Sequence, residues 1–183
     1  LIIGKGDPAS SWQIASPDGS ITALFALHDG KISYASFKDN NLVVDNSYVG
    51  LTTSLGDFSE LSFVDRVDEE INDPYELIGA KVTQVENHAN QTTLNFTKEG
   101  VEGVTFSVIV RAYDDGVAIQ YDLPDGSHTV SGDDTRFAIP TDATAFYQYG
   151  DGSNYEGIKN MQVPTETSQV SAIGTDRLLC TLP

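Results

Sequence analysis

Carboxylates are the most abundant chemically active side chains in this sequence of 183 residues, with 27 Asp and Glu against 10 Lys and Arg. Two carboxylates can act as acid and base in sugar hydrolysis when they face each other across a cleft at a defined separation. The adjacent pairs Asp114-Asp115 and Asp133-Asp134 do not fit this requirement, because neighbouring side chains of an extended chain point to opposite sides. We interpret both pairs as turn residues, and the sequence offers no catalytic residue.

The other common catalytic and metal-binding patterns are missing from the sequence. His28, His88 and His128 are far apart, beside turn residues, and lack the spacing of a zinc site, so we expect them on the surface. The single cysteine, Cys180, excludes an internal disulfide and a cysteine-based zinc cluster. No nucleophile elbow, phosphate loop or dinucleotide fingerprint occurs.

The charge balance predicts which partners the protein avoids. The formal net charge of -17 repels phosphate backbones and anionic lipid surfaces, so we expect neither nucleic acid nor membrane as a partner. No run of about 18 apolar residues is present that could span a bilayer. Most of the acidic side chains are interpreted as solvated, and only a few as candidates for binding a cation.

Aromatic side chains could form a platform on which a sugar ring stacks. Tyr34, Tyr113 and Tyr121 alternate with polar residues inside expected strands, which favours packing. The better candidates lie outside clean alternation, although packing in the core or between domains is the favoured use for them as well. These candidates are Trp12, Phe146, Tyr147, Tyr149 and Tyr155.

The elements that must position these residues are expected to be strands. The clearest is 105–113, where Phe106, Val108, Val110 and Ala112 share one face. Asp114-Asp115-Gly116 then predicts a turn through the left-handed region, and 117–121 resumes the alternation, so 105–121 is expected to be a hairpin. Further strands are expected at 20–27, 31–37, 42–44, 63–67 and 92–97, separated by turn residues. Turn signals about every 8 to 12 residues predict an all-β protein, an antiparallel β-sandwich.

Some segments carry weaker or irregular patterns. We expect 68–74 to be a polar break, 81–85 to be a strand, and Gly79 to mark a bulge or a close backbone approach. A short strand is expected at 137–140. The last part of the chain, from 162 onward, shows no strong period.

The sequence of the hairpin, Arg111-Ala112-Tyr113-Asp114-Asp115-Gly116-Val117-Ala118, resembles the amino-terminal domain of glycoside hydrolase family 97. Other segments resemble that domain in the same order, including Ser16-Pro17-Asp18-Gly19 and 29–34. The segment from Asp73-Pro74-Tyr75 to Gly79 also matches, but lacks the tryptophans often present there. The resemblance covers about 10–157. It implies a super-sandwich of the galactose mutarotase type. Residues 1–183 are expected to form one domain that is incomplete at its end, and the resemblance is not distinct over 158–183.

The resemblance also implies a function. Family 97 enzymes are α-glucosidases and α-galactosidases, largely bacterial and exported, whose catalytic carboxylates lie in a central barrel that binds calcium. This chain would then be the amino-terminal region that supports the barrel, inactive alone, in a periplasmic or secreted enzyme that acts on an α-glucoside or α-galactoside. Asn154 and Tyr155 match substrate-binding positions and Glu156 matches a calcium ligand, with a solvated loop as the alternative for Glu156. Alternative functions are a free-standing carbohydrate-binding module and a structural β-protein.

Overall fold

The computed structural model describes residues 11–79, 81, 83–98, 105–140, 144–148, 158–162 and 177–182. These residues form strands and turns without a helix, and all strand pairs are antiparallel, which confirms the expected all-β class. No helix in the described ranges has the length and apolar character needed to cross a membrane. The division into one domain over 1–183 stays a prediction.

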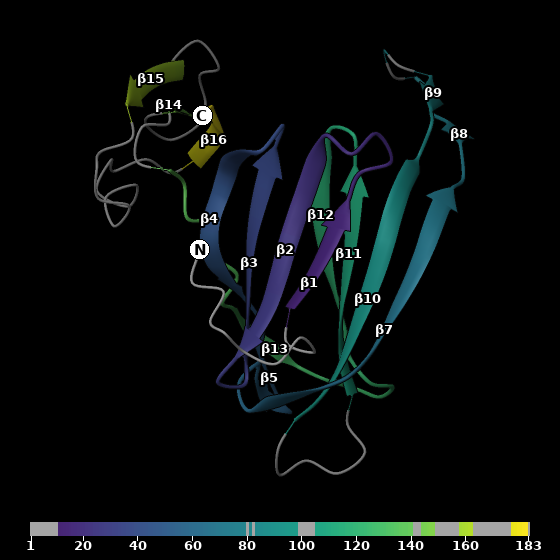
Figure 1. Ribbon diagram of the computed structural model, residues 1–183. Coiled ribbons are helices and arrows are strands. Elements are labelled where there is room, and N and C mark those ends of the chain that lie inside the picture. The colour runs from purple at the N-terminus through teal and green to yellow at the C-terminus, as the bar shows by residue number, and fades with distance from the viewer. Residues whose placement is uncertain are drawn as a thin grey trace.

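Two four-stranded sheets make the sandwich (Figure 1). The first sheet has the order β1-β2-β3-β4, and the second has the order β12-β11-β10-β7. The strands of the first sheet are β1 (Ser11–Ala15), β2 (Ile21–His28), β3 (Lys31–Lys38) and β4 (Asn41–Val49). The strands of the second sheet are β7 (Leu61–Asn72), β10 (His88–Lys98), β11 (Thr105–Tyr113) and β12 (Gly116–Asp122).

Smaller sheets complete the described residues. One has the order β13-β5-β6, with β5 (Leu51–Thr53), β6 (Gly56–Asp57) and β13 (Val130–Asp133). The second pairs β8 (Tyr75–Glu76) with β9 (Gln84–Val85). The third has the order β15-β14-β16, with β14 (Thr144–Gln148), β15 (Ile158–Gln162) and β16 (Arg177–Leu182).

The core lies between the two large sheets, where alternating apolar side chains of both meet. Phe96, Phe106, Val108 and Val110 of the second sheet are fully buried. Trp12 of β1 packs against this layer, with its ring centroid 5.9 Å from that of Phe96, so Trp12 is a core residue. The sandwich therefore forms for the reason the alternation indicated, because one face of the central strands β2 and β11 is apolar and has to be covered.

The two sheets are offset from each other. β1 contacts β10 and β11, and β2 contacts β11 and β12, so β3 and β4 extend past β12 on one side while β7 extends past β1 on the other (Figure 1). Each overhang has part of an inner sheet face that the opposite sheet does not cover. The chemistry of these two overhangs differs, and this difference bears on function.

Several expectations about individual segments were wrong. Residues 68–72 are not a polar break but continue β7, because β10 pairs with them and the side chains of Gln91 and Thr92 donate hydrogen bonds to Glu69 and Asp68. Among the described residues of 81–85, the strand is limited to Gln84–Val85, and Gly79 is a turn residue with φ 79° and open space around it, not a bulge. The segment 137–140 makes one bridge, between Ala138 and Asp45, and forms no strand.

The hairpin of β11 and β12 is confirmed, with Tyr113 opposite Gly116, but its turn differs from the expectation. None of Asp114, Asp115 and Gly116 has a positive φ, so the turn does not use the left-handed region. A tertiary contact holds it instead, because the Asp114 side chain bonds to another turn.

Candidate functional site

The segment Arg111 to Asp114, which carries the most specific sequence pattern, holds the sandwich together. The Arg111 Nε donates to Gln91 Oε1 at 2.6 Å and the Tyr113 hydroxyl donates to Asn87 Oδ1 at 3.2 Å, both on the solvent side of the second sheet. Ala112 faces the core and is fully buried. These contacts tie β11 to β10 and to the segment before it, so the pattern is structural in this part of the molecule.

The turn at Asp114 joins the two sheets. Its Oδ1 accepts the backbone N–H of Asp18 at 2.9 Å, and its carbonyl accepts Lys38 Nζ at 3.3 Å. Asp18 lies in the Ser16–Gly19 turn, where its Oδ1 accepts the Ser16 hydroxyl at 2.7 Å and the Ser20 N–H at 2.8 Å. These hydrogen bonds, that of Ser16 foremost, hold the pKa of Asp18 well below its ordinary value. Two of the segments that carried the family resemblance thus meet in space.

The adjacent carboxylate pairs are not catalytic dyads. Asp133 Oδ1 accepts the Thr135 N–H at 2.9 Å, and hydrogen bonds from Thr135 lower the pKa of Asp133. Asp134 Oδ2 accepts the Thr52 hydroxyl at 2.7 Å. Asp133 therefore stabilises its own loop, and Asp134 ties that loop to β5.

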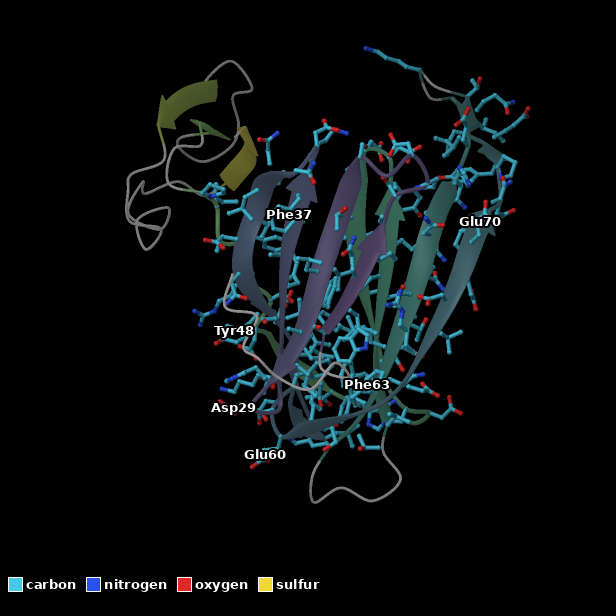
Figure 2. The ribbon with its side chains drawn as sticks, in the orientation of Figure 1. Asp29, Phe37, Tyr48, Glu60, Phe63 and Glu70 are labelled. Atoms are coloured by element: carbon cyan, nitrogen blue, oxygen red, sulfur yellow. The ribbon has the colours of Figure 1, made fainter. Side chains whose placement is uncertain are left out.

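The described residues contain no group of three or more His, Cys, Asp or Glu side chains that could hold a metal ion. The histidines are on separate elements: His28 is 3.2 Å from Asp29, His88 is 3.0 Å from Glu70, and His128 Nε2 lies 2.9 Å from the Pro124 carbonyl. Asp29 and Glu70 mark nearly opposite ends of the sandwich in Figure 2.

The overhang of β7 beyond β1 is polar. Arg66 donates to Asp68 at 2.8 Å and to the Gln13 carbonyl at 3.1 Å, and the Asn90 amide donates to the Ala15 carbonyl at 2.9 Å. The groove along this overhang, about 380 Å³ in volume, is lined largely by such polar side chains. This uncovered inner face is suited to water.

The overhang of β3 and β4 beyond β12 is apolar. A cleft of about 460 Å³, which we call the β4–β12 cleft, lies beneath it and is lined by Val44, Val117, Ile119, Tyr121 and Phe137 among others. Phe137 belongs to the segment 134–138, whose backbone bonds to the outer edge of β4, and its side chain is 65% exposed. An open and largely apolar cleft with a large exposed ring at its rim is typical of a surface that another structure covers.

One end of the β4–β12 cleft is closed by hydrogen bonds between tyrosines and the chain. The Tyr34 hydroxyl donates to the Arg136 carbonyl at 3.1 Å, and the Tyr121 hydroxyl bonds to Thr135 and accepts the Gly50 N–H at 3.0 Å. Burial raises the pKa of Tyr34 to about 12 and also raises the pKa of Tyr121. Both hydroxyls remain neutral at physiological pH and hold the neighbouring chain through hydrogen bonds.

The site residues inferred from resemblance, Asn154, Tyr155 and Glu156, lie outside the described residues, as does Tyr149. Their roles in substrate and calcium binding stay predictions. The residues that line the β4–β12 cleft were not identified from sequence as functional. Alternation indicated that Val117 and Ile119 belong to an apolar face, and only the offset of the sheets shows that this face is incompletely covered.

Comparison with known proteins supports one family. The model of the family described as glycosyl hydrolase 97 N-terminal matches residues 14–183. A probable retaining α-galactosidase of Streptomyces bingchenggensis is 29% identical over 142 residues, which cover 75% of this chain and 22% of that protein.

Solved structures share the fold. A glycoside hydrolase family 97 enzyme from Pseudoalteromonas sp. strain K8, in complex with panose, superposes with a TM-score of 0.71 at 23% identity over 83% of this chain and 24% of its own. A β-arabinopyranosidase superposes with a TM-score of 0.71 at 24% identity over 84% of this chain and 26% of its own. The chain thus spans about a quarter of the length of these relatives. With the family model matched from residue 14 to residue 183, this chain belongs to the glycosyl hydrolase 97 N-terminal family.

Proposed function

We propose that this chain is the amino-terminal β-sandwich region of a family 97 glycosidase and supports a catalytic barrel carried by the same polypeptide. The observation that carries the proposal is the β4–β12 cleft, an open and largely apolar cleft whose Val44, Val117 and Ile119 are only partly buried among the described residues. On the opposite overhang, the part of the β7 face that is not covered by the other sheet carries polar side chains that water can solvate. An apolar face in the same situation favours a covering partner.

The test uses the product of the complete reading frame that contains this chain, called the whole polypeptide below. The isolated chain is expected to have no activity on nitrophenyl α-glucoside or nitrophenyl α-galactoside, because we place the catalytic acid and base in the barrel. The whole polypeptide is expected to hydrolyse one of them. Turnover by the isolated chain, or a reading frame without a barrel, contradicts the proposal.

The role of the cleft is tested by Phe137→Ala, with Val64→Ala of β7 as the control at 50% exposure. In the isolated chain both substitutions should leave the melting temperature nearly unchanged, because both side chains are largely exposed. In the whole polypeptide only Phe137→Ala should lower it, because its ring is then buried by the partner. Equal effects of the two substitutions in the whole polypeptide would remove the cleft from the interface.

The proposal includes calcium bound mostly by ligands outside this chain, with Glu156 as one donor. Calcium takes six to eight oxygens, and the described residues do not supply such a set. The isolated chain should bind calcium weakly or not at all. In the whole polypeptide, Glu156→Gln should weaken calcium affinity measured by calorimetry, whereas Asp151→Asn in the same acidic stretch should not. Unchanged affinity of the Glu156 variant excludes that role.

Export to the periplasm or the medium is also part of the proposal, and cell fractionation tests it.

A second candidate function, carbohydrate binding by this chain itself, is favoured by one surface. Tyr48 lines an open cleft of about 440 Å³ together with Lys31, Asp134 and Arg136. An exposed ring beside side chains that donate and accept hydrogen bonds suits a pyranose. Titration with maltose and melibiose tests this: Tyr48→Ala should abolish binding and Tyr75→Ala, equally exposed at 48%, should not. No binding by the unmodified chain rejects this candidate.

A further inference from the structure

The outer edge of β12 has unpaired backbone groups at predictable positions. A two-residue turn is closed by the hydrogen-bonded pair Tyr113 and Gly116, and bonded pairs recur at every second residue of an antiparallel ladder. The N–H groups of Ala118 and Gln120 therefore point to β11, and those of Val117 and Ile119 point away from it. Within the described residues, no strand pairs with this outer edge.

The space beside this edge of β12 is bordered by the apolar face of the overhanging strands β3 and β4. A strand added to β12 would lie about 4.8 Å from it, beneath the overhang of β3 and β4. Its inner side chains would enter the β4–β12 cleft and meet Val44 and Phe137. The space narrows at Tyr121, whose hydroxyl bonds to Thr135, so the added strand would run beside Gly116 to Gln120.

The other free edge of this sheet, β7, does not offer the same arrangement. Its uncovered inner face carries Arg66, Asp68 and Glu70, which are solvated or bonded to neighbours. Charged side chains along an edge discourage pairing with another strand. The contrast singles out β12, where the free N–H groups and the apolar face coincide.

From this coincidence we propose that a β-strand pairs with the outer edge of β12 and fills the β4–β12 cleft, and that it is supplied by the part of the longer family 97 polypeptide that follows this chain. The inference rests on the proposed function. The added strand has apolar residues at alternate positions, because one of its faces packs against the overhang of β3 and β4. Its backbone hydrogen bonds are made with β12. The relatives are long enough to contain such a strand outside the matched part, because that part spans only 22–26% of their length.

A second copy of this chain cannot supply the strand in the same way. Antiparallel pairing of two β12 edges requires a two-fold axis perpendicular to the sheet, which places both β1–β4 sheets on the same side. The overhanging β3 and β4 of each copy would then collide with the first sheet of the other. Parallel pairing would place the partner's first sheet on the opposite side of the joined sheet, so the core-facing side chains of the partner's β12 would point away from the β4–β12 cleft.

The test is hydrogen–deuterium exchange at single-residue resolution, on the isolated chain and on the whole polypeptide. In the isolated chain, Val117 and Ile119 should exchange about 100-fold faster than Ala118 and Gln120, which serve as internal controls. In the whole polypeptide, Val117 and Ile119 should slow to the rates of the controls. Sedimentation of the isolated chain as a monomer should accompany the fast exchange.

The outcomes separate this inference from the proposed function. A whole polypeptide that hydrolyses a glycoside while Val117 and Ile119 still exchange rapidly overturns the added strand and leaves the function standing. Protection of both amides in the isolated chain, dependent on protein concentration, assigns the edge to a second copy and overturns the inference. A reading frame without a barrel contradicts the function, and if Val117 and Ile119 exchange rapidly in its product, the inference is overturned too.

Discussion

Replacement of Gly30 by Ala should destabilise the sandwich far more than the same replacement at Gly19. Both glycines have a positive φ, 70° at Gly30 and 76° at Gly19, so both pay the cost of placing an L side chain in the left-handed region. A Cβ at Gly19 meets no atom within 4 Å, whereas a Cβ at Gly30 would lie 2.7 Å from Glu60 Cα and 2.8 Å from Glu60 N. The two sites therefore differ by packing alone.

The magnitudes follow from these contacts. At Gly19, a conformational cost of about 1–2 kcal/mol is partly offset by about 0.4–1 kcal/mol from the stiffer unfolded chain, which leaves a loss of about 1 kcal/mol. At Gly30, overpacking against the backbone adds about 1–3 kcal/mol. The shift also strains the bond from the Leu61 N–H to the Gly30 carbonyl, 3.0 Å long, worth about 1 kcal/mol. The total loss at Gly30 is about 3–5 kcal/mol.

The assay is urea unfolding of the isolated chain followed by circular dichroism, together with thermal melting. For a chain of this size about 1 kcal/mol corresponds to about 2–4 °C, so Gly30→Ala should lower the melting temperature by about 10 °C and Gly19→Ala by about 3 °C. Equal losses at the two positions would refute the reasoning, because they would show that the turn at Gly30 does not press on Glu60.

Three further substitutions test the core and the titrating groups. Phe96→Ala, at a fully buried ring, should lower the free energy of unfolding by about 3–5 kcal/mol in urea, and a loss below about 1 kcal/mol would contradict its place in the core. The pKa of Asp18 is lowered by the hydrogen bond from Ser16, so its contribution to stability is present above about pH 4 and is lost as the pH falls through its folded pKa. The difference in unfolding free energy between the wild type and Asp18→Asn should therefore shrink between about pH 5 and pH 2, and a constant difference would be inconsistent with the Ser16 bond. Burial raises the pKa of Tyr34 to about 12, so its contribution is present below about pH 10 and is lost as the pH rises through about 12, and urea titrations should show a shallower alkaline loss for Tyr34→Phe than for the wild type.

The sequence by itself determined the local structure wherever one strand face repeats every second residue. Phe106, Val108, Val110 and Ala112 alternate with polar residues, and the structure buries all four. Trp12 also lies in the core, which was the favoured interpretation for it. The family resemblance rested on the same hairpin. Periodicity is a property of neighbouring residues, so a single chain is sufficient to read it.

Only the tertiary structure decided what lies opposite each face and which turns are held from a distance. The segment 68–72 has the composition of a loop, yet it is a strand because β10 pairs with it. Asp114 avoids the left-handed region expected of its turn while it bonds to Asp18, a residue 96 positions earlier. Val117 and Ile119 have an ordinary apolar pattern, and they border an open cleft because the two sheets are offset. Pairing partners and sheet offset depend on residues far apart in the chain, and local spacing carries no information about them.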